Sequence, residues 1–318
     1  MVKNKKILIT GGAGFIGTKL CKKLLPHNDI VIFDNLTRNS IQYTTILKNS
    51  NVKFVNGDVR DKNSVNQVVK DKDIILHLAA IAGVSFYYKN PIKVIEVNYH
   101  GTKNILDSVK TNNIELFLDM STSEIYGTQA QFVTEDDSPS SFPPNDMRSV
   151  YAKSKNLGEQ IAFCYALEYN LPVICVRPFN IYGPGQIGEG AISNMIQKAI
   201  NNEKISITGD GSSVRAWCYI DDFVEAIIRL IDIRNKISAE AFNIGNSAEV
   251  QTTLNLARII KRITKSQSTI NFVKHVGTDI PIRIPDISKA VKIINFQPMI
   301  DLEMGITKTL NWWNKLKQ

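Results

Sequence analysis

Seven residues near the N-terminus, Gly11-Gly12-Ala13-Gly14-Phe15-Ile16-Gly17, constrain the fold more than any other stretch. They follow the apolar run Ile7–Thr10, which predicts a buried strand, and they open a segment with helical apolar spacing. In a strand–turn–helix unit, Gly11 permits the tight turn and Gly14 lets a pyrophosphate approach the helix N-terminus. Gly17 allows the helix to pack closely on the strand. The stretch therefore predicts a dinucleotide site.

A second apolar run, Asp29–Asp34, ends in a carboxylate about twenty residues after the glycines, where an acid that binds the ribose 2′-hydroxyl is expected. A carboxylate at Asp34 would repel a 2′-phosphate, so the sequence favours NAD over NADP. Arg38 weakens this preference slightly, and we interpret it as a loop residue.

Apolar runs continue to alternate with segments of helical spacing, which predicts parallel βαβ units and an α/β, doubly wound (Rossmann) sheet. The further strands are expected at Val52–Val55, Ile74–Ala80, Leu116–Met120 and Pro172–Arg177, and the helices at Ser64–Lys70, Pro91–Lys110 and Val150–Glu168. Ligands of such sheets bind beyond the carboxyl ends of the strands. Asp58, Ala79 and Ser121–Glu124 follow strand ends, whereas His77 is interpreted as a packed strand histidine. The polar loop Thr134–Arg148 is expected to form the edge of an active-site lid.

From Gly183 onward the loops lengthen and Gly and Pro punctuate the chain, which predicts a smaller C-terminal substrate-binding region. We expect a cofactor domain at 1–180, to which 222–245 return, and a substrate region formed by 181–221 and 246–318. The returning pieces are a helix at Asp222–Ile233 and a strand at Ala241–Ile244, and a last helix begins near Asp301.

Composition narrows the possible partners. The chain has 318 residues, 43% hydrophobic, and a net charge of +8, but its lysines are dispersed, so no nucleic acid is expected. No apolar run is long enough for a membrane span, and the N-terminus carries no apolar leader. The scattered cysteines indicate a reducing compartment and no metal site. A cytoplasmic location is therefore expected.

Tyr151 and Lys155 stand one helical turn apart and share a helix face. A neighbouring ammonium favours phenolate and lowers the pKa of a phenol from about 10, which would produce a base for a sugar hydroxyl. Thr122, at a strand end, is expected to donate a further hydrogen bond there.

The sequence resembles the extended short-chain dehydrogenase/reductase family, specifically its NAD-dependent nucleotide-sugar epimerases, dehydratases and decarboxylases. The resemblance covers essentially the whole chain. It rests on the glycine stretch, Gly57-Asp58-Val59, His77-Leu78-Ala79-Ala80, Asn98, Thr122 with Tyr151 and Lys155, Arg177-Pro178-Phe179-Asn180-Ile181-Tyr182-Gly183-Pro184, and Arg215 before Tyr219-Ile220-Asp221-Asp222.

The resemblance implies a bound NAD, a nucleotide-sugar substrate and a homodimer built from the helices at 91–110 and 150–168, with Ile105, Phe163 and Leu167 on their outer sides. Tyr151, Lys155 and Thr122 would act at C4 of the sugar, and Tyr87 and Arg283 would lie beside the sugar. Asn180 and Arg215 would hold the diphosphate. Ile192 would lie beside the nucleobase. The implied cofactor residues are Gly11, Gly14, Phe15, Ile16, Gly17, Asp34, Asn35, Asp58, Val59, Leu78, Ala79, Ala80, Asn98, Tyr151 and Lys155.

The reaction depends on Ser123 and Glu124, which complete the implied catalytic set. Family members first oxidise C4, and a 4-epimerase then returns the hydride without an acid beside Thr122. Glu124 matches the base with which 4,6-dehydratases remove the C5 proton, so we favour a dehydratase. Thr122-Ser123-Glu124 and Arg283 also resemble UDP-glucuronate decarboxylases, so this alternative and the epimerase stay open. A protein that only binds dinucleotide is disfavoured, because such relatives usually lose the tyrosine or the lysine.

Overall fold

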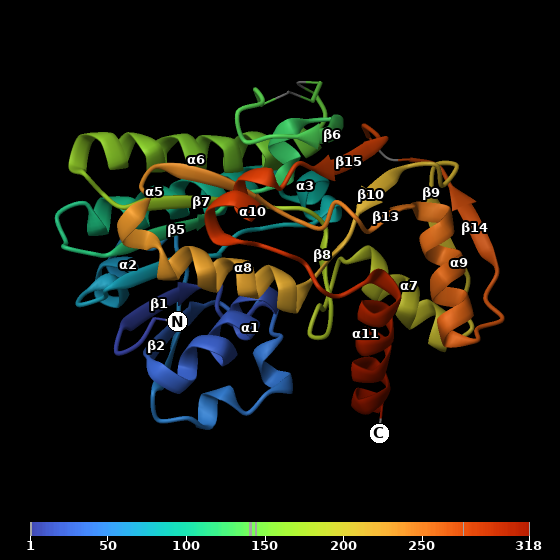
Figure 1. Ribbon diagram of the computed structural model, residues 1–318, viewed down its shortest axis with the longest axis horizontal. Coiled ribbons are helices and arrows are strands. Elements are labelled where there is room, and N and C mark those ends of the chain that lie inside the picture. Colours follow the sequence, from blue (N-terminus) through green and yellow to red (C-terminus); the bar gives the residue numbers. More distant parts are fainter. Residues whose placement is uncertain (1, 140–141, 144, 276, 318) are drawn as a thin grey trace.

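The computed structural model describes residues 2–139, 142–143, 145–275 and 277–317. Its centre is a parallel sheet with the strand order β12-β7-β5-β4-β1-β2-β3 (Figure 1). The strands are β1 (Lys6–Thr10), β2 (Asp29–Asp34), β3 (Val52–Asn56), β4 (Ile74–His77), β5 (Leu116–Met120), β7 (Val173–Pro178) and β12 (Glu240–Ile244). The doubly wound Rossmann sheet expected from the alternating pattern is therefore confirmed.

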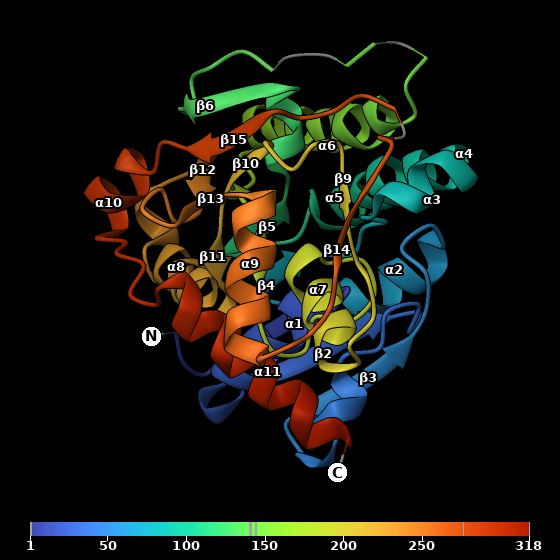
Figure 2. The ribbon, with the colours of Figure 1, turned by 90° about the vertical axis from the view of Figure 1, so that its right-hand side faces the viewer.

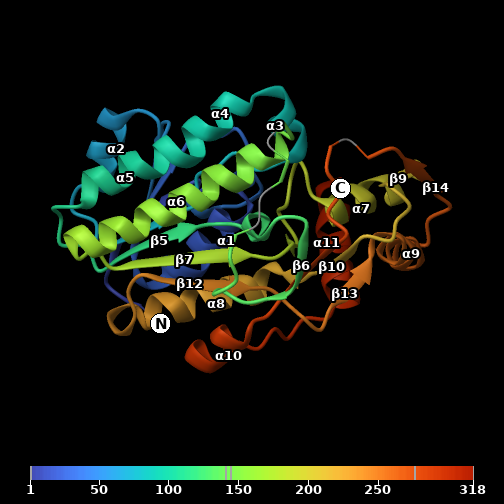
Figure 3. The same ribbon diagram turned by 90° about the horizontal axis from the view of Figure 1, so that it is seen from above.

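The strands are apolar along their whole length because both faces of the sheet are covered. Ile7 and Ile9 of β1 belong to one buried cluster, and Leu8 between them belongs to another. Helices α1 (Phe15–Leu24) and α8 (Ile220–Asp232) pack on the first face, while α2 (Lys62–Val69), α5 (Gly101–Val109) and α6 (Arg148–Tyr169) pack on the second, as Figure 3 shows. The strand order reverses between β1 and β4, which is the switch point where such sheets bind ligands.

Two predicted elements differ from the structure. The fourth strand ends at His77, so Leu78 to Ala80 form a loop. The helix predicted over 91–110 consists of α4 (Pro91–Ile95), a π-helical segment η4 (Glu96–His100) and α5. A π turn holds an additional residue and rotates the helix that continues after it. Ile105, predicted on the outer side, lies fully buried on the same face of α5 as Thr102, Leu106 and Val109.

The C-terminal region contains more regular structure than the expected loops. Helices α7 (Ala191–Ile200), α9 (Thr253–Thr264) and α11 (Leu302–Lys317) pack together beside the pair β9 (Ile205–Thr208) and β14 (Ile270–Val273), as Figure 2 shows. Its remaining strands are β8 (Ile181–Tyr182), β11 (Cys218–Tyr219), β10 (Val214–Ala216), β13 (Val250–Thr252) and β15 (Ile282–Pro285), and its remaining helix is α10 (Ser288–Ile294).

A small sheet positions the arginines of this region. Its order is β13-β10-β15-β6, where β6 (Gln129–Val133) follows the loop after β5. Arg215 of β10 is the register partner of Arg283 of β15. Arg283 lies near the carboxyl end of β5, because it bonds Glu124 and Gly127 O in the loop that follows this strand. Within the described part of the chain, no helix combines the length and apolarity needed to cross a membrane.

Candidate active site

A cavity of ≈490 Å³ lies at the carboxyl ends of the central strands and is lined mostly by the residues that the sequence predicted. It brings together Gly11, Gly14, Phe15, Ile16, Gly17, Asp34, Asn35, Asp58, Val59, Leu78, Ala79, Ala80, Tyr87, Thr122, Ser123, Glu124, Tyr151, Asn180 and Arg283. Four other predicted residues, Asn98, Lys155, Ile192 and Arg215, lie outside this lining.

The glycine turn has the geometry that a dinucleotide requires. Gly11 has φ +68 and donates its N–H to Phe33 O at 2.9 Å, and a Cβ on it would lie 2.7 Å from the backbone nitrogen of Ala79. A Cβ on Gly17 would lie 2.5 Å from Cα of Gly12. These close approaches leave the N-terminus of α1 open to the cavity, so the residues present fit a bound pyrophosphate.

The two predicted acids line the same cavity but are held differently. Asp34 accepts hydrogen bonds from the N–H groups of Ala13 (3.0 Å) and Leu36 (2.7 Å), while burial raises its pKa. The pKa of Asp58 is lowered by its hydrogen bonds to Arg60, at 2.8 Å in the closest contact. Both acids therefore stand at strand ends with defined orientations, as cofactor recognition would require.

Two polar side chains support the cavity wall from behind. Asn98, fully buried, accepts a hydrogen bond from the N–H of Ile81 at 2.8 Å and donates to its carbonyl at 3.3 Å. It thereby fixes the loop after β4. His77, also fully buried, lies between the hydroxyls of Thr10 (2.7 Å) and Thr102 (3.0 Å). Burial lowers its pKa to about 3, which agrees with a packed strand histidine.

Tyr151 lines the cavity and stacks on Tyr87, with ring centroids 4.8 Å apart. Burial raises the pKa of Tyr151 to about 12, and the Thr122 hydroxyl lowers it only in part. The pKa of Tyr151 is therefore raised, not lowered as its spacing to Lys155 predicted. Lys155, on the same helix, is buried. Its ammonium lies 3.6 Å from Oδ1 of Asp119, which is also fully buried.

Glu124 is held by two guanidinium groups. Arg148 donates from Nε to Oε2 at 2.9 Å and from Nη2 to Oε1 at 2.8 Å, and Arg283 donates from Nη1 to Oε1. Burial alone would raise the pKa of Glu124, but the charge of Arg283 and the hydrogen bonds and charge of Arg148 lower it to about 2. Glu124 is therefore an ionised counter-ion in this site.

Arg283 lines the cavity and is only 2% exposed. Its Nη2 donates to Gly127 O at 2.8 Å, and its Nε has no hydrogen-bond partner among the described residues. A buried, unpaired N–H of a cation is costly unless an anion binds it. Arg283 therefore contributes a buried positive charge to the cavity wall beside Glu124.

Of the residues predicted to hold the diphosphate and the nucleobase, only Asn180 lines the cavity. Asn180 lines the cavity and donates its amide to Ala216 O at 2.9 Å. Arg215 bonds the carbonyl of Val214, and burial together with the charges of Arg283 and Arg148 lowers its pKa to about 10. Ile192 is fully buried in α7 and packs in the core. The structure thus brings Asn180 to the cavity and keeps Arg215 and Ile192 behind it.

Arg148 is the main site residue that sequence reasoning missed. It stands one helical turn before Tyr151, and this spacing alone places it on the tyrosine's side of α6. Sequence reasoning assigned the region to a lid loop, of which positions 140, 141 and 144 lie outside the described residues. Glu189 was missed too, and Arg38 was interpreted only as a loop residue, although both line the cavity. Arg38 donates to Ala82 O, and Ser85 donates to Glu189, so both residues border the cofactor end of the cavity.

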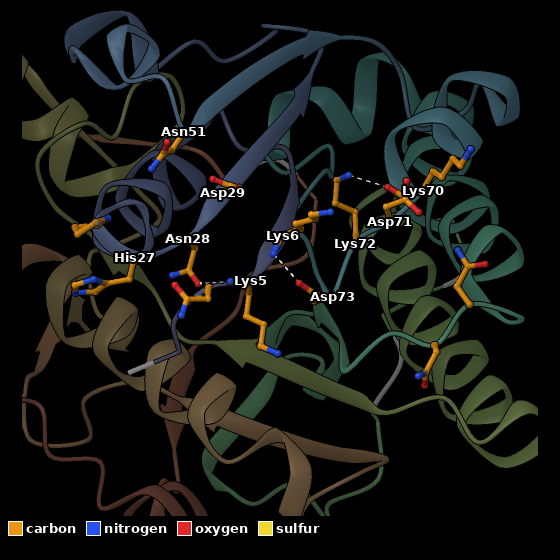
Figure 4. A pocket seen from close by; sticks show the side chains of 14 residues that line it. Lys5, Lys6, His27, Asn28, Asp29, Asn51, Lys70, Asp71, Lys72 and Asp73 are labelled. Atoms are coloured by element: carbon orange, nitrogen blue, oxygen red, sulfur yellow. Dashed lines mark hydrogen bonds between the residues drawn. The ribbon is translucent and has the colours of Figure 1, made fainter.

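A larger cavity, of ≈960 Å³, lies at the opposite, amino-terminal edge of the sheet (Figure 4). Its lining mixes lysines with aspartates, and its polar groups bond one another: Lys6 N–H donates to Asp73 at 2.7 Å, and Lys5 N–H donates to Asn28 at 3.1 Å. It is open and lies away from the glycine turn. We therefore assign the chemistry to the smaller cavity.

Comparison with known proteins agrees with this site. The chain is 35% identical to a UDP-N-acetyl-alpha-D-glucosaminuronate decarboxylase of Bacillus cytotoxicus, over 98% of this chain and 99% of that protein. Its fold matches the UDP-glucuronic acid 4-epimerase of Bacillus cereus, which was solved with UDP-glucuronic acid and NAD. The TM-score is 0.90 and the identity is 29%, and the match covers 98% of this chain and 99% of that chain. It also matches a dTDP-glucose 4,6-dehydratase of Bacillus anthracis, solved with NAD, with a TM-score of 0.86, 28% identity, and 98% and 97% covered.

The family model described as the NAD dependent epimerase/dehydratase family matches residues 7–245, from the first strand to the last strand of the central sheet. This range includes the glycine turn, Asp34, Thr122, Glu124, Tyr151 and Lys155, and NAD fits the cavity that most of these residues line. The protein is therefore a member of the NAD-dependent epimerase/dehydratase family, with NAD as its cofactor.

Proposed function

We propose that this NAD-dependent nucleotide-sugar-modifying enzyme is a decarboxylase of a UDP-hexuronate. The observation that carries the proposal is Arg283, a buried guanidinium in the cavity wall that shares Glu124 with Arg148. A hexuronate differs from a hexose by a carboxylate at C6, and guanidinium is the side chain best suited to bind it.

The residues at C4 support the first step. NAD, when bound, supplies the hydride acceptor and donor for the sugar carbon. Tyr151 accepts the proton of the C4 hydroxyl, and Thr122, whose hydroxyl interacts with the phenol, orients that hydroxyl. Lys155, one helical turn further along α6, is paired with Asp119 at 3.6 Å. The result is a 4-keto sugar held in the cavity.

The second step needs no base. In the 4-keto hexuronate the C6 carboxylate is β to the ketone, so the C5–C6 bond can break and its electron pair moves into a C4–C5 enolate. Carbon dioxide leaves, and a proton then adds to C5. The hydride and the proton taken from C4 and its hydroxyl would then return to the C4 carbonyl, so that the net change is the loss of carbon dioxide. Arg283 orients the carboxylate before it leaves, and the cationic surroundings stabilise the developing enolate.

A 4,6-dehydratase, which the sequence first favoured, would require Glu124 to remove the C5 proton. A carboxylate with a pKa of about 2, shared between two guanidiniums, is a poor base for that step. The relatives point in the same direction: the decarboxylase of Bacillus cytotoxicus and the epimerase of Bacillus cereus are both named for a hexuronate.

The test is a product analysis by mass spectrometry. The purified protein is incubated with UDP-glucuronate, UDP-N-acetylglucosaminuronate, UDP-glucose and dTDP-glucose. We expect a product lighter by one carbon dioxide from a hexuronate only. Loss of water from a hexose would replace the proposal with a dehydratase, and an unchanged mass with a C4 epimer would replace it with an epimerase.

We further propose that the enzyme acts as a homodimer in the cytoplasm, joined through α4, α5 and α6. The outward sides of α4 and α6 carry exposed apolar residues, of which Leu167 (87% exposed) and Ile92 (72%) are the most prominent. Ile105 takes no part in this surface, because it lies in the core.

A further inference from the structure

We infer that Arg148 is a positioning residue that makes the sugar end of the cavity select a uronate over a neutral sugar. The inference rests on the proposed function for the nature of its substrate, but it concerns binding selectivity and holds for any hexuronate reaction at this site.

The carboxylate of Glu124 is shared unequally between the two arginines. Glu124 uses both of its oxygens on Arg148, with hydrogen bonds of 2.8 and 2.9 Å, and only Oε1 on Arg283. The fork of Arg148 therefore holds Glu124 in one orientation, and Arg283 makes a single contact with it. Arg283 keeps its Nε unpaired among the described residues, while its remaining nitrogen is occupied by Gly127 O at 2.8 Å.

Glu124 and the two arginines together carry a surplus of positive charge. An isolated Glu124–Arg283 pair would be neutral and would offer a substrate carboxylate no net attraction. With Arg148 included, the three groups in contact carry two positive charges and one negative charge. The surplus is one positive charge in a largely buried setting, where Coulomb interactions are strong. One bound carboxylate would neutralise it, whereas a C6 hydroxyl would leave it unbalanced.

Arg148 acts on the cavity indirectly. The described lining of the cavity includes Glu124 and Arg283 and does not include Arg148, so Arg148 acts through Glu124. Its backbone N–H donates to Asp146 at 2.8 Å, and its guanidinium lies over the Phe142 ring at 5.8 Å. Asp146 also accepts from the hydroxyl of Tyr88 at 2.6 Å and from the N–H of Thr278 at 2.5 Å. These contacts fix the first turn of α6.

Other charged groups face Arg148 as well. Asp146 partly offsets its charge, and Arg215 of β10, outside the cavity lining, adds a positive charge. Neither forms a side-chain contact with Glu124 in the described structure, so the direct pairing remains that of one carboxylate with two guanidiniums. The surplus at the sugar end therefore depends on Arg148.

The test compares affinities for two sugars that differ only at C6, UDP-glucuronate and UDP-glucose. Calorimetry uses the NAD-loaded protein with Tyr151→Phe in every variant to block turnover. We expect the parent to prefer UDP-glucuronate, and we expect Arg148→Met to lower that preference at least tenfold while the affinity for UDP-glucose stays within about twofold. Arg148→Lys keeps the charge and loses the fork, so it should retain part of the preference.

The matched control is Lys153→Met, which removes the same charge from an exposed position of the same helix and should leave the preference unchanged. An unchanged preference in Arg148→Met, an equal loss of both affinities, or a parent without preference would overturn the inference. The proposed function fails separately, by the absence of carbon dioxide release from UDP-hexuronates by the unmodified enzyme.

Discussion

At the residue scale, the site depends on how buried charges are paired. Glu124 alone at a strand end would be a candidate base, but with Arg148 and Arg283 on its oxygens it becomes a counter-ion with a pKa of about 2. Tyr151 shows the opposite effect: burial against Tyr87 raises its pKa to about 12. Each shift follows from the neighbours that the fold supplies and not from the residue type.

Tyr151→Phe should abolish oxidation at C4 while NAD remains bound. General base catalysis is typically worth about 10²- to 10⁴-fold in rate, and the phenol contributes little to the cofactor site. Because the pKa of Tyr151 lies above its ordinary value, the parent's rate should rise with pH across the alkaline range. The measurement is the absorbance of reduced cofactor after substrate is added. Tyr165→Phe, on the same helix with its hydroxyl on Asp107, is the control. A near-parental rate in Tyr151→Phe would show that another group is the base.

Glu124→Gln should destabilise the protein at neutral pH, and the difference should vanish in acid. The folded-state pKa of Glu124 is depressed from 4.5 to about 2, so its ionisation stabilises the fold above 4.5 and that stabilisation is lost as the pH falls toward 2. The full difference in unfolding free energy is on the order of 3 kcal/mol. Urea unfolding of both proteins at neutral and acid pH measures it. Glu168→Gln, at an exposed position of α6, should show no such pH dependence. A pH-independent gap for Glu124→Gln would contradict the assigned pKa.

At the element scale, the unit β1–turn–α1 positions the cofactor by close backbone contact. The N–H of Gly11 is bonded to Phe33 O of β2, and Gly17 of α1 lies against the backbone of Gly12. The helix can only approach this closely because these positions lack a Cβ. Helix α6 instead positions side chains, since it presents Tyr151 and Arg148 to the cavity side and Lys155 to Asp119 of β5.

Gly17→Ala should weaken NAD binding at least tenfold and lower the melting temperature. The new Cβ would lie 2.5 Å from Cα of Gly12, which is backbone and can yield only if the turn moves. Binding of NAD to the cofactor-free protein is the measurement. Gly158→Ala in α6 is the matched control, because its Cβ would meet nothing closer than 3.5 Å and alanine favours a helix. Equal NAD affinity in Gly17→Ala and the parent would mean that the turn is not the pyrophosphate site.

At the scale of the whole molecule, the active site forms where two sheets meet. The central sheet supplies the glycine turn, Asp34 and Thr122, and the small sheet of β13, β10, β15 and β6 supplies Arg283. Strand β15 pairs with β6, which follows directly from the loop that holds Glu124. Because of this pairing, Arg283 donates a hydrogen bond to Glu124 although the two residues are 159 positions apart in the sequence.

The proposed dimer is tested by Leu167→Glu. Leu167 is 87% exposed on the outward side of α6, and a charge there would be buried without a partner in a helix–helix interface. We expect the parent to scatter light as a dimer at micromolar concentration and the variant to scatter as a monomer. Met299→Glu changes another exposed apolar residue, 75% exposed and outside these helices, and should leave the dimer intact. A monomeric parent would refute the dimer.

The sequence by itself determined the central sheet, the glycine turn, Asp34 and the cofactor, because these depend on local pattern: buried parallel strands are apolar along their length, and the turn needs glycine at fixed spacing. It also indicated Tyr151, Lys155, Thr122 and Glu124, since strand ends and helix faces can be located from the same pattern. Their pKa values could not be predicted, because each is set by groups brought from other elements.

The tertiary structure alone decided the role of Glu124. Arg148 comes from α6 and Arg283 from β15, and only the packing of these elements places both guanidiniums on one carboxylate. Ile105, expected on the outer side of its helix, lies in the core on the same face of α5 as Thr102, Leu106 and Val109. Local periodicity indicates which residues can face a core. The ionisation of the site residues depends instead on contacts between residues far apart in the sequence, which a local pattern does not reveal.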